Sequence, residues 1–189
     1  MKRVLMVRHG PTHAKSMVGW SDIPADLSDE PALTRLRAAL PDAPVVSSDL
    51  IRAVATADAV QETRPRLPHD ADLRELHFGA WELRRWDDVN AEDPDAIRAF
   101  WEQPGDTAPP GGESWNALSR RVTGAVDRLL DVHDTIVIVA HFGAILAQAQ
   151  RAAGWTAQEA FAHKVEPLSL SETVRRPNGW ELLRLGDQP

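Results

Sequence analysis

Two short apolar runs in this chain each lead into a histidine. Residues 4–7 (Val-Leu-Met-Val) are followed directly by Arg8 and His9. Residues 136–139 (Ile-Val-Ile-Val) lead through one alanine to His141. Short runs of branched apolar residues between turn formers are typical of strands buried on both faces. Ligands in parallel sheets bind outside the carboxyl ends of the strands, so both histidines are expected at one such edge.

The segments between the apolar runs carry helical patterns. Residues 50–61 and 142–153 are rich in alanine and apolar residues, and residues 114–131 repeat apolar residues at helical spacing. The expected buried face of that third segment consists of Leu118, Val122, Ala125 and Leu129. Because a further short run at residues 45–46 also precedes a helical segment, strands alternate with helices. This order predicts an α/β fold, a three-layer sandwich with a mostly parallel central sheet flanked by helices.

Length and composition predict a single domain over residues 1–189, because the chain is long enough for a sizeable core and 43% hydrophobic. A Pro-Asn-Gly turn inside residues 169–185 predicts a hairpin at one edge of the sheet. Residues 82–113, with Trp86, Trp101 and several prolines and glycines, are expected to form an insertion over the sheet. This insertion either carries specificity or is a plain surface excursion held by its tryptophans.

Charge and cysteine content restrict the partners of the chain. A formal net charge of -7 argues against binding to nucleic acids or anionic membranes, which needs basic surface. The chain has no cysteine, which excludes disulfides, thiolate metal sites and a cysteine nucleophile and fits a cytoplasmic location. No apolar stretch is long enough to span a bilayer, and the short run after Met1 is no signal peptide.

The residues after the first strand suit phosphate chemistry. Gly10 permits a sharp turn or a close ligand, and the guanidinium of Arg8 can hold phosphate oxygens in a bidentate way. A neutral imidazole at His9 keeps one lone pair available for attack on phosphorus. The alternative is an ordinary histidine in a strand-end turn beside a surface arginine.

Two further motifs add a cation and an acid. Ser48 or Asp49 is expected to cap the helix after the second strand, with Arg52 in its first turn. A cation there is disfavoured by the helix dipole, and a bound anion would offset that effect. Glu75 lies in Leu73–Glu82 between apolar neighbours, a setting that raises the pKa of a carboxyl group.

These motifs together resemble the histidine phosphatase superfamily, the phosphoglycerate-mutase-like proteins. The matching blocks follow the family order over nearly the whole chain: Arg-His-Gly-x-Thr at 8–12, Ser-x-Leu-x-Arg-x-x-x-Thr-Ala at 48–57, Leu-x-Glu-x-x-x-Gly-x-Trp-Glu at 73–82, Pro-Gly-Gly-Glu-Ser at 110–114 and His-x-Gly at 141–143. The resemblance implies a phosphomonoesterase acting on a small phosphorylated metabolite without metal or other cofactor.

The resemblance also implies a role for each matching residue. His9 would be the nucleophile that forms a phosphohistidine, and Glu75 would be the general acid and base. Arg8, Arg52 and His141 would surround the transferred phosphoryl group. Three more residues are expected to contact phosphate or substrate: Thr12, Lys15 and Phe142.

The chain departs from the family pattern at several positions. Val18 stands where many relatives have glutamine before Gly-Trp, and Lys15 lies near an expected asparagine. Leu146 takes a position often held by arginine, and Leu83 follows Glu82 where glycine is usual. We expect these departures to affect substrate choice and turnover. Glu82 itself is either a secondary acid or the anchor of a loop.

Three alternatives remain at this point. A metal hydrolase is one, because His9 and His13 have the spacing of zinc ligands on a helix, although Gly10 and Pro11 between them indicate a turn. A catalytically weakened relative that only binds a phosphorylated ligand is another, favoured by Val18 but opposed by the retained histidines. The third is a phosphoglycerate-mutase-type phosphotransferase, which the short chain disfavours. The sequence does not specify an oligomeric state.

Overall fold

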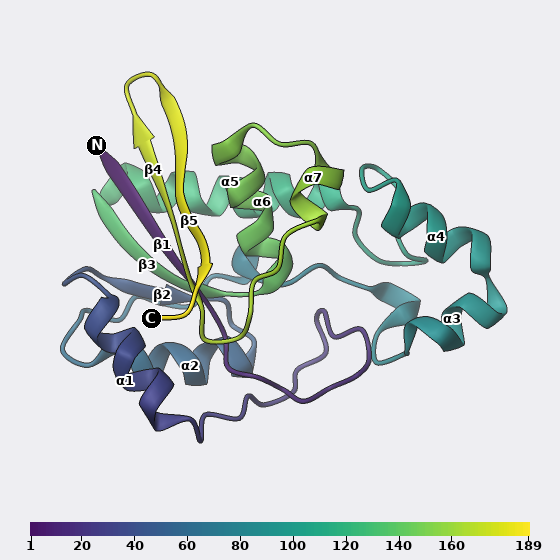
Figure 1. The fold of residues 1–189 in the computed structure, drawn as a ribbon, viewed down its shortest axis with the longest axis horizontal. Coiled ribbons are helices and arrows are strands. Elements are labelled where there is room, and N and C mark those ends of the chain that lie inside the picture. Colours follow the sequence, from purple (N-terminus) through teal and green to yellow (C-terminus); the bar gives the residue numbers. More distant parts are fainter.

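The computed structural model describes residues 1–189 and contains a five-stranded sheet of order β2-β3-β1-β4-β5. Its strands are β1 (Lys2–Arg8), β2 (Val45–Ser47), β3 (Thr135–Ala140), β4 (Leu170–Arg176) and β5 (Gly179–Asp187). β3 pairs in parallel with both β1 and β2, whereas β4 pairs antiparallel with β1 and β5. Only β4 therefore runs against the others, which confirms the mostly parallel sheet. The hairpin of β4 and β5 ends the sheet, as expected (Figure 1).

Helices cover both faces of the sheet (Figure 1). α1 (Glu30–Ala39) and α2 (Ile51–Gln61) pack on one face against Leu5 and Val7. α5 (Trp115–Val132), α6 (Phe142–Ala153) and α7 (Ala157–Phe161) pack on the other against Val4 and Met6. Neighbouring side chains of a strand point to opposite faces, so a strand covered on both sides must be apolar throughout. This explains why β1 and β3 contain continuous apolar runs in the sequence.

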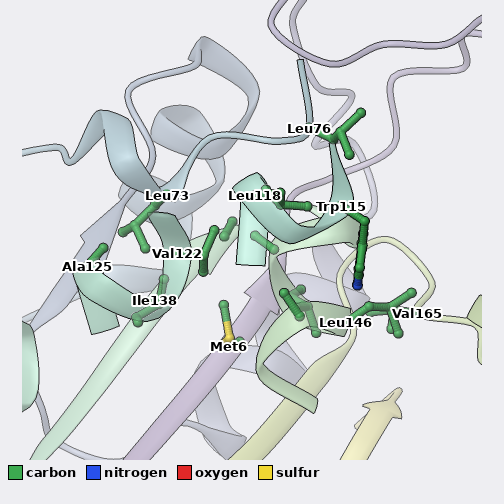
Figure 2. Packing of buried hydrophobic residues seen from close by; sticks show 14 of the residues in the cluster. Met6, Leu73, Leu76, Trp115, Leu118, Val122, Ala125, Ile138, Leu146 and Val165 are labelled. Carbon is green, nitrogen blue, oxygen red and sulfur yellow. The ribbon is translucent and has the colours of Figure 1, made fainter. Parts of the chain in front are cut away.

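The core between the sheet and α5 and α6 is shown in Figure 2. Leu118, Val122 and Ala125 face the sheet as expected, but Leu129 is only half-buried and Leu130 takes its place in the core. Leu146 is fully buried in this cluster. The phase of α6 thus turns Leu146, which departs from the family pattern, into the core.

Residues 82–113 form α3 (Trp86–Glu92), α4 (Pro94–Glu102) and a loop. They extend to one side of the molecule rather than across a sheet face, on the right in Figure 1. Trp101 packs edge-on against Phe100, with ring centroids 5.0 Å apart, and lies near Phe161 of α7. Trp86 is exposed. The two tryptophans of this segment thus lie in different environments.

None of the helices combines the length and apolar character that crossing a bilayer requires.

Candidate active site

The register between β1 and β3 brings the two histidines together. Arg8 pairs with Ala140, so His9 and His141 are the next residues along two neighbouring parallel strands. The His9 amide donates to the Ala140 carbonyl over 3.1 Å, and the two imidazole centroids are 5.0 Å apart. From α2, Arg52 reaches the same place, with its Nε 3.3 Å from His9 Nε2. The convergence expected from the sequence is present.

The hydrogen bonds of His9 define its tautomer. Its Nδ1 lies 2.7 Å from the carbonyl oxygen of Gly10, which can only accept, so Nδ1 carries the hydrogen. Nε2 is then left with a lone pair, facing the Nε–H donor of Arg52. Burial, together with the charges of Arg52 and Arg8, lowers the pKa of His9 to about 3. At neutral pH the ring is therefore an uncharged base whose lone pair is on Nε2.

His141 is fully buried, and its tautomer follows from Ser48. The Ser48 hydroxyl accepts from the Leu50 amide over 3.2 Å and lies 2.7 Å from His141 Nε2. His141 Nε2 is the acceptor within reach of the Ser48 hydroxyl, so the hydroxyl donates its hydrogen to Nε2. The ring hydrogen of His141 is then on Nδ1. Nδ1 is buried and has no partner in the chain. Burial and the nearby His9, Arg52 and Arg8 lower the pKa of His141, which leaves a neutral ring with a free N–H donor.

Two guanidinium groups, one of the buried Arg52 and one of the half-buried Arg8, make this hollow positive. Arg52 is only 1% exposed and donates to the carbonyls of Gly19 and Ser21 over 2.6 and 2.8 Å. Arg8 donates to the Val165 carbonyl, its Nε is buried without a partner, and it lies over the Phe142 ring. Neither arginine forms an ion pair with a carboxylate. Since an uncompensated buried charge is unfavourable, the arrangement favours an anion.

Glu75 places a carboxyl group at the amino end of α6. The Gly143 amide donates to both carboxyl oxygens, over 3.0 and 3.1 Å, and the Leu76 amide donates to Oε1 over 2.9 Å. Burial raises the pKa of Glu75 despite these bonds, so this carboxyl group keeps its proton to a higher pH than an exposed one. Gly143 is required here, because a Cβ atom at this position would lie 2.4 Å from Oε1. The indole N–H of Trp20 donates to the backbone carbonyl of Glu75 over 2.8 Å, which holds the backbone of this residue in place.

Glu82 anchors the loop that holds Arg52 and is not an acid of the cavity. Its carboxylate accepts from the amides of Gly19, Trp20, Ser21 and Phe78 and from the Ser21 hydroxyl. Burial opposes ionisation of Glu82, but these bonds outweigh it and hold its pKa below the usual range. The same loop turns the carbonyls of Gly19 and Ser21 toward Arg52. Nothing in the local sequence pattern indicated this contact across sixty-odd residues.

A cavity of about 240 Å³ opens at the carboxyl ends of the strands. Its lining includes Arg8, His9, Arg52 and Glu75, and also the expected contacts Thr12 and Phe142. His141 is fully buried and does not line the cavity, but its ring lies next to that of His9. Lys15 is exposed and does not line the cavity, so the structure does not bring it to the site. Val18, the departure from the family pattern, does line it.

The expected cap of α2 is corrected. Neither Ser48 nor Asp49 is the N-cap of α2, which is Leu50. The first helical amide, that of Ile51, instead bonds Asp22 over 2.7 Å, while Asp49 pairs with Arg74. A distant loop thus caps the helix, a contact that helix-start signals do not reveal.

His13 and Leu83 both have positive φ angles. His13 has a positive φ of 58° in an irregular segment and pairs with Asp26, so the helical spacing needed for a zinc pair with His9 is absent. No group of three or more potential metal ligands gathers anywhere in the chain. Leu83 has φ of 61°, a left-handed conformation that glycine adopts more easily. The glycine expected here from the family pattern would adopt this angle without strain.

Comparison with known proteins gives consistent matches. The model of the histidine phosphatase superfamily (branch 1) matches residues 4–188. The adenosylcobalamin/alpha-ribazole phosphatase of Salmonella typhimurium is 33% identical over 152 residues, which cover 76% of this chain and 75% of that protein. The glucosyl-3-phosphoglycerate phosphatase of Mycolicibacterium vanbaalenii is 32% identical over 163 residues, 78% of this chain and 72% of that protein. The solved structure of Bacillus stearothermophilus YhfR has a TM-score of 0.89 at 26% identity, covering 99% and 98% of the two chains.

We predict that Glu82→Gln destabilises the protein by about 1–3 kcal/mol, because an amide nitrogen cannot accept from the backbone donors it would face. Denaturant unfolding measures this change, and hydrogen exchange at residues 19–21 should accelerate. The matched control is Glu92→Gln, which breaks only an exposed pair with Arg84 and is expected to change stability by less than about 1 kcal/mol. Equal effects of the two substitutions would show that Glu82 does not hold the loop.

Proposed function

Because this chain belongs to the histidine phosphatase superfamily, we propose that it is a metal-independent phosphomonoesterase that hydrolyses a small phosphorylated metabolite through a phosphohistidine on His9. The observation that carries this proposal is the unprotonated Nε2 of His9, which accepts from the Arg52 guanidinium in a cavity that also holds a carboxyl group. The named relatives are phosphatases, which supports hydrolysis over transfer to a second acceptor.

In the first step, the Nε2 lone pair of His9 attacks phosphorus and forms a P–N bond. The ester P–O bond breaks, and its electron pair goes to the leaving oxygen, which takes the proton of the Glu75 carboxyl group. The ring of the phosphohistidine is cationic, and its Nδ1–H remains bonded to the Gly10 carbonyl, 2.7 Å away. An intermediate of this kind divides one difficult displacement into two easier ones.

In the second step, the Glu75 carboxylate accepts a proton from water while the water oxygen bonds to phosphorus. The P–N bond breaks, its electrons return to Nε2 of His9, and inorganic phosphate leaves. Glu75 is protonated again, so the cycle closes. The burial that raises the pKa of Glu75 favours this return of the proton.

The remaining groups of the site would stabilise the phosphoryl oxygens. Phosphoryl transfer depends mainly on positioning and on stabilising negative charge at these oxygens. Arg8 has a buried Nε without a partner, and His141 has a buried Nδ1 without a partner. These two nitrogens have no partner in the chain, and the Arg52 guanidinium adds positive charge beside them although its own nitrogens already bond His9, Gly19 and Ser21. We propose Arg8, Arg52 and His141 as the phosphate ligands, with Thr12 at the cavity wall.

We expect His9→Ala to lower kcat/KM for para-nitrophenyl phosphate by at least about 1,000-fold, because the nucleophile is removed. His13→Ala is the matched control and should retain activity, since His13 pairs with Asp26 at the surface. Activity should also survive a strong chelator. Loss of activity on chelation, restored by zinc and reproduced in His13→Ala, would instead support a metal hydrolase. Full activity of His9→Ala would reject the proposed mechanism.

Glu75→Gln is expected to lower kcat/KM by about 100- to 10,000-fold for alkyl esters, whose leaving oxygens need a proton, and much less for nitrophenyl esters. The first step needs protonated Glu75, whose pKa is raised, so wild-type activity should fall as pH rises through that value. The variant should lack this alkaline limb. Steady-state kinetics across pH and leaving groups measure both effects. An equal loss for all esters would assign the acid role elsewhere.

A further inference from the structure

The cavity around His9 has two chemically different parts. The part at the strand ends is charged, and the proposed function uses it for the phosphoryl group. The rest of the lining, where the esterified alcohol must lie, consists of Thr12, Ala14, Ser16, Met17, Val18, Phe78, Trp101 and Phe142. None of these side chains carries a charge, and most are apolar. This part of the cavity is therefore suited to an uncharged group.

A smaller cavity of about 40 Å³, here called the aromatic annex, adjoins this apolar part. The two cavities share Glu75, Phe78, Trp101 and Phe142 in their linings. The other walls of the annex include Phe100, Trp115 and Phe161. Because Glu75 lies in both linings, the annex begins where the proposed proton donor meets the leaving oxygen. A leaving group bonded to that oxygen has aromatic surface directly ahead of it.

Cations that could bind a second negative charge lie outside the cavity or are already paired. Lys15 is exposed and does not line it. Arg74 pairs with Asp49, and Arg121 pairs with Glu113. A carboxylate or second phosphate on the leaving group would lose water here without gaining a partner, and such burial is strongly unfavourable.

Resting on the proposed function, we propose that the substrates are monoesters of uncharged alcohols or phenols with an apolar, ring-sized part. That part lies against Trp101 and Phe78 in the larger cavity, at the side where the aromatic annex adjoins it. Both cavities are small beside typical ligand sites of roughly 300–1,000 Å³, so a single ring fits better than a large cofactor-like group. Esters with a second negative charge are discriminated against. Trp101 gives the 82–113 segment its role in this selection.

Three primary alkyl esters test the proposal, because their leaving oxygens are chemically similar. They are 2-phenylethyl phosphate, glycerol 3-phosphate and 3-phosphoglycerate, and release of inorganic phosphate gives kcat/KM for each. We expect 2-phenylethyl phosphate to exceed glycerol 3-phosphate by about tenfold or more, with 3-phosphoglycerate lower still. The first difference reports the ring, and the second reports the added carboxylate.

Variants test which residues produce this substrate preference. Trp101→Ala should reduce the preference for 2-phenylethyl phosphate over glycerol 3-phosphate by about tenfold, mainly through KM. Trp86→Ala is the matched control, since Trp86 belongs to the same segment but is exposed and lines neither cavity. Val18→Lys adds a cation to the wall and should raise relative activity on 3-phosphoglycerate. Thermal melts check that each variant is folded, and the wild-type comparison does not depend on them.

The outcomes separate the two proposals. Phosphate release that favours 3-phosphoglycerate or glycerol 3-phosphate over the phenylethyl ester overturns this inference and leaves the proposed function intact. An unchanged preference in folded Trp101→Ala overturns the assignment to the annex. No release from any ester, para-nitrophenyl phosphate included, overturns the proposed function and this inference with it.

Discussion

The site depends on keeping two guanidinium groups, one buried and one half-buried, beside imidazoles that stay neutral. Burying a charge without a counter-charge is unfavourable, and the chain offsets this for Arg52 only with carbonyl oxygens and the lone pair of His9. The cations in turn oppose protonation of both histidines. One electrostatic arrangement thus produces an attraction for anions and an unprotonated nitrogen in the same place. A bound phosphoryl group would supply the missing negative charge.

The fold supplies this arrangement through strand register and loop anchoring. Parallel pairing of β1 with β3 ends both strands at one edge of the sheet. The strand register alone therefore brings the rings of His9 and His141 together. The cations need more support than the histidines. Glu82 fixes the loop whose carbonyls hold Arg52, and the Gly10 amide bonds the Thr56 hydroxyl of α2 over 3.0 Å. Hydrogen bonds from neighbouring loops and helices thereby hold the charged side chains in place.

The features that could be predicted are those with a local or periodic signal. Apolar runs of four residues marked β1 and β3, and the repeat in residues 114–131 marked α5 to within a residue at each end. The meeting of the histidines followed from the geometry of parallel strands. The bond from Asp22 to α2 and the loop contact of Glu82 join segments far apart in the chain, and no spacing encodes them. Leu146 was identified as a departure from the family pattern, but the motif did not indicate that the helical phase places it in the core.

The charge state of His9 tests the central claim most directly. In protein labelled with ¹⁵N at histidine, nitrogen shifts near pH 5.5, about one unit below the ordinary histidine pKa, report protonation and tautomer. A His9→Gln spectrum assigns the signal. The account predicts a neutral His9 ring with hydrogen on Nδ1 and none on Nε2. A doubly protonated ring, or hydrogen on Nε2, would contradict it, because no lone pair would then face the cavity.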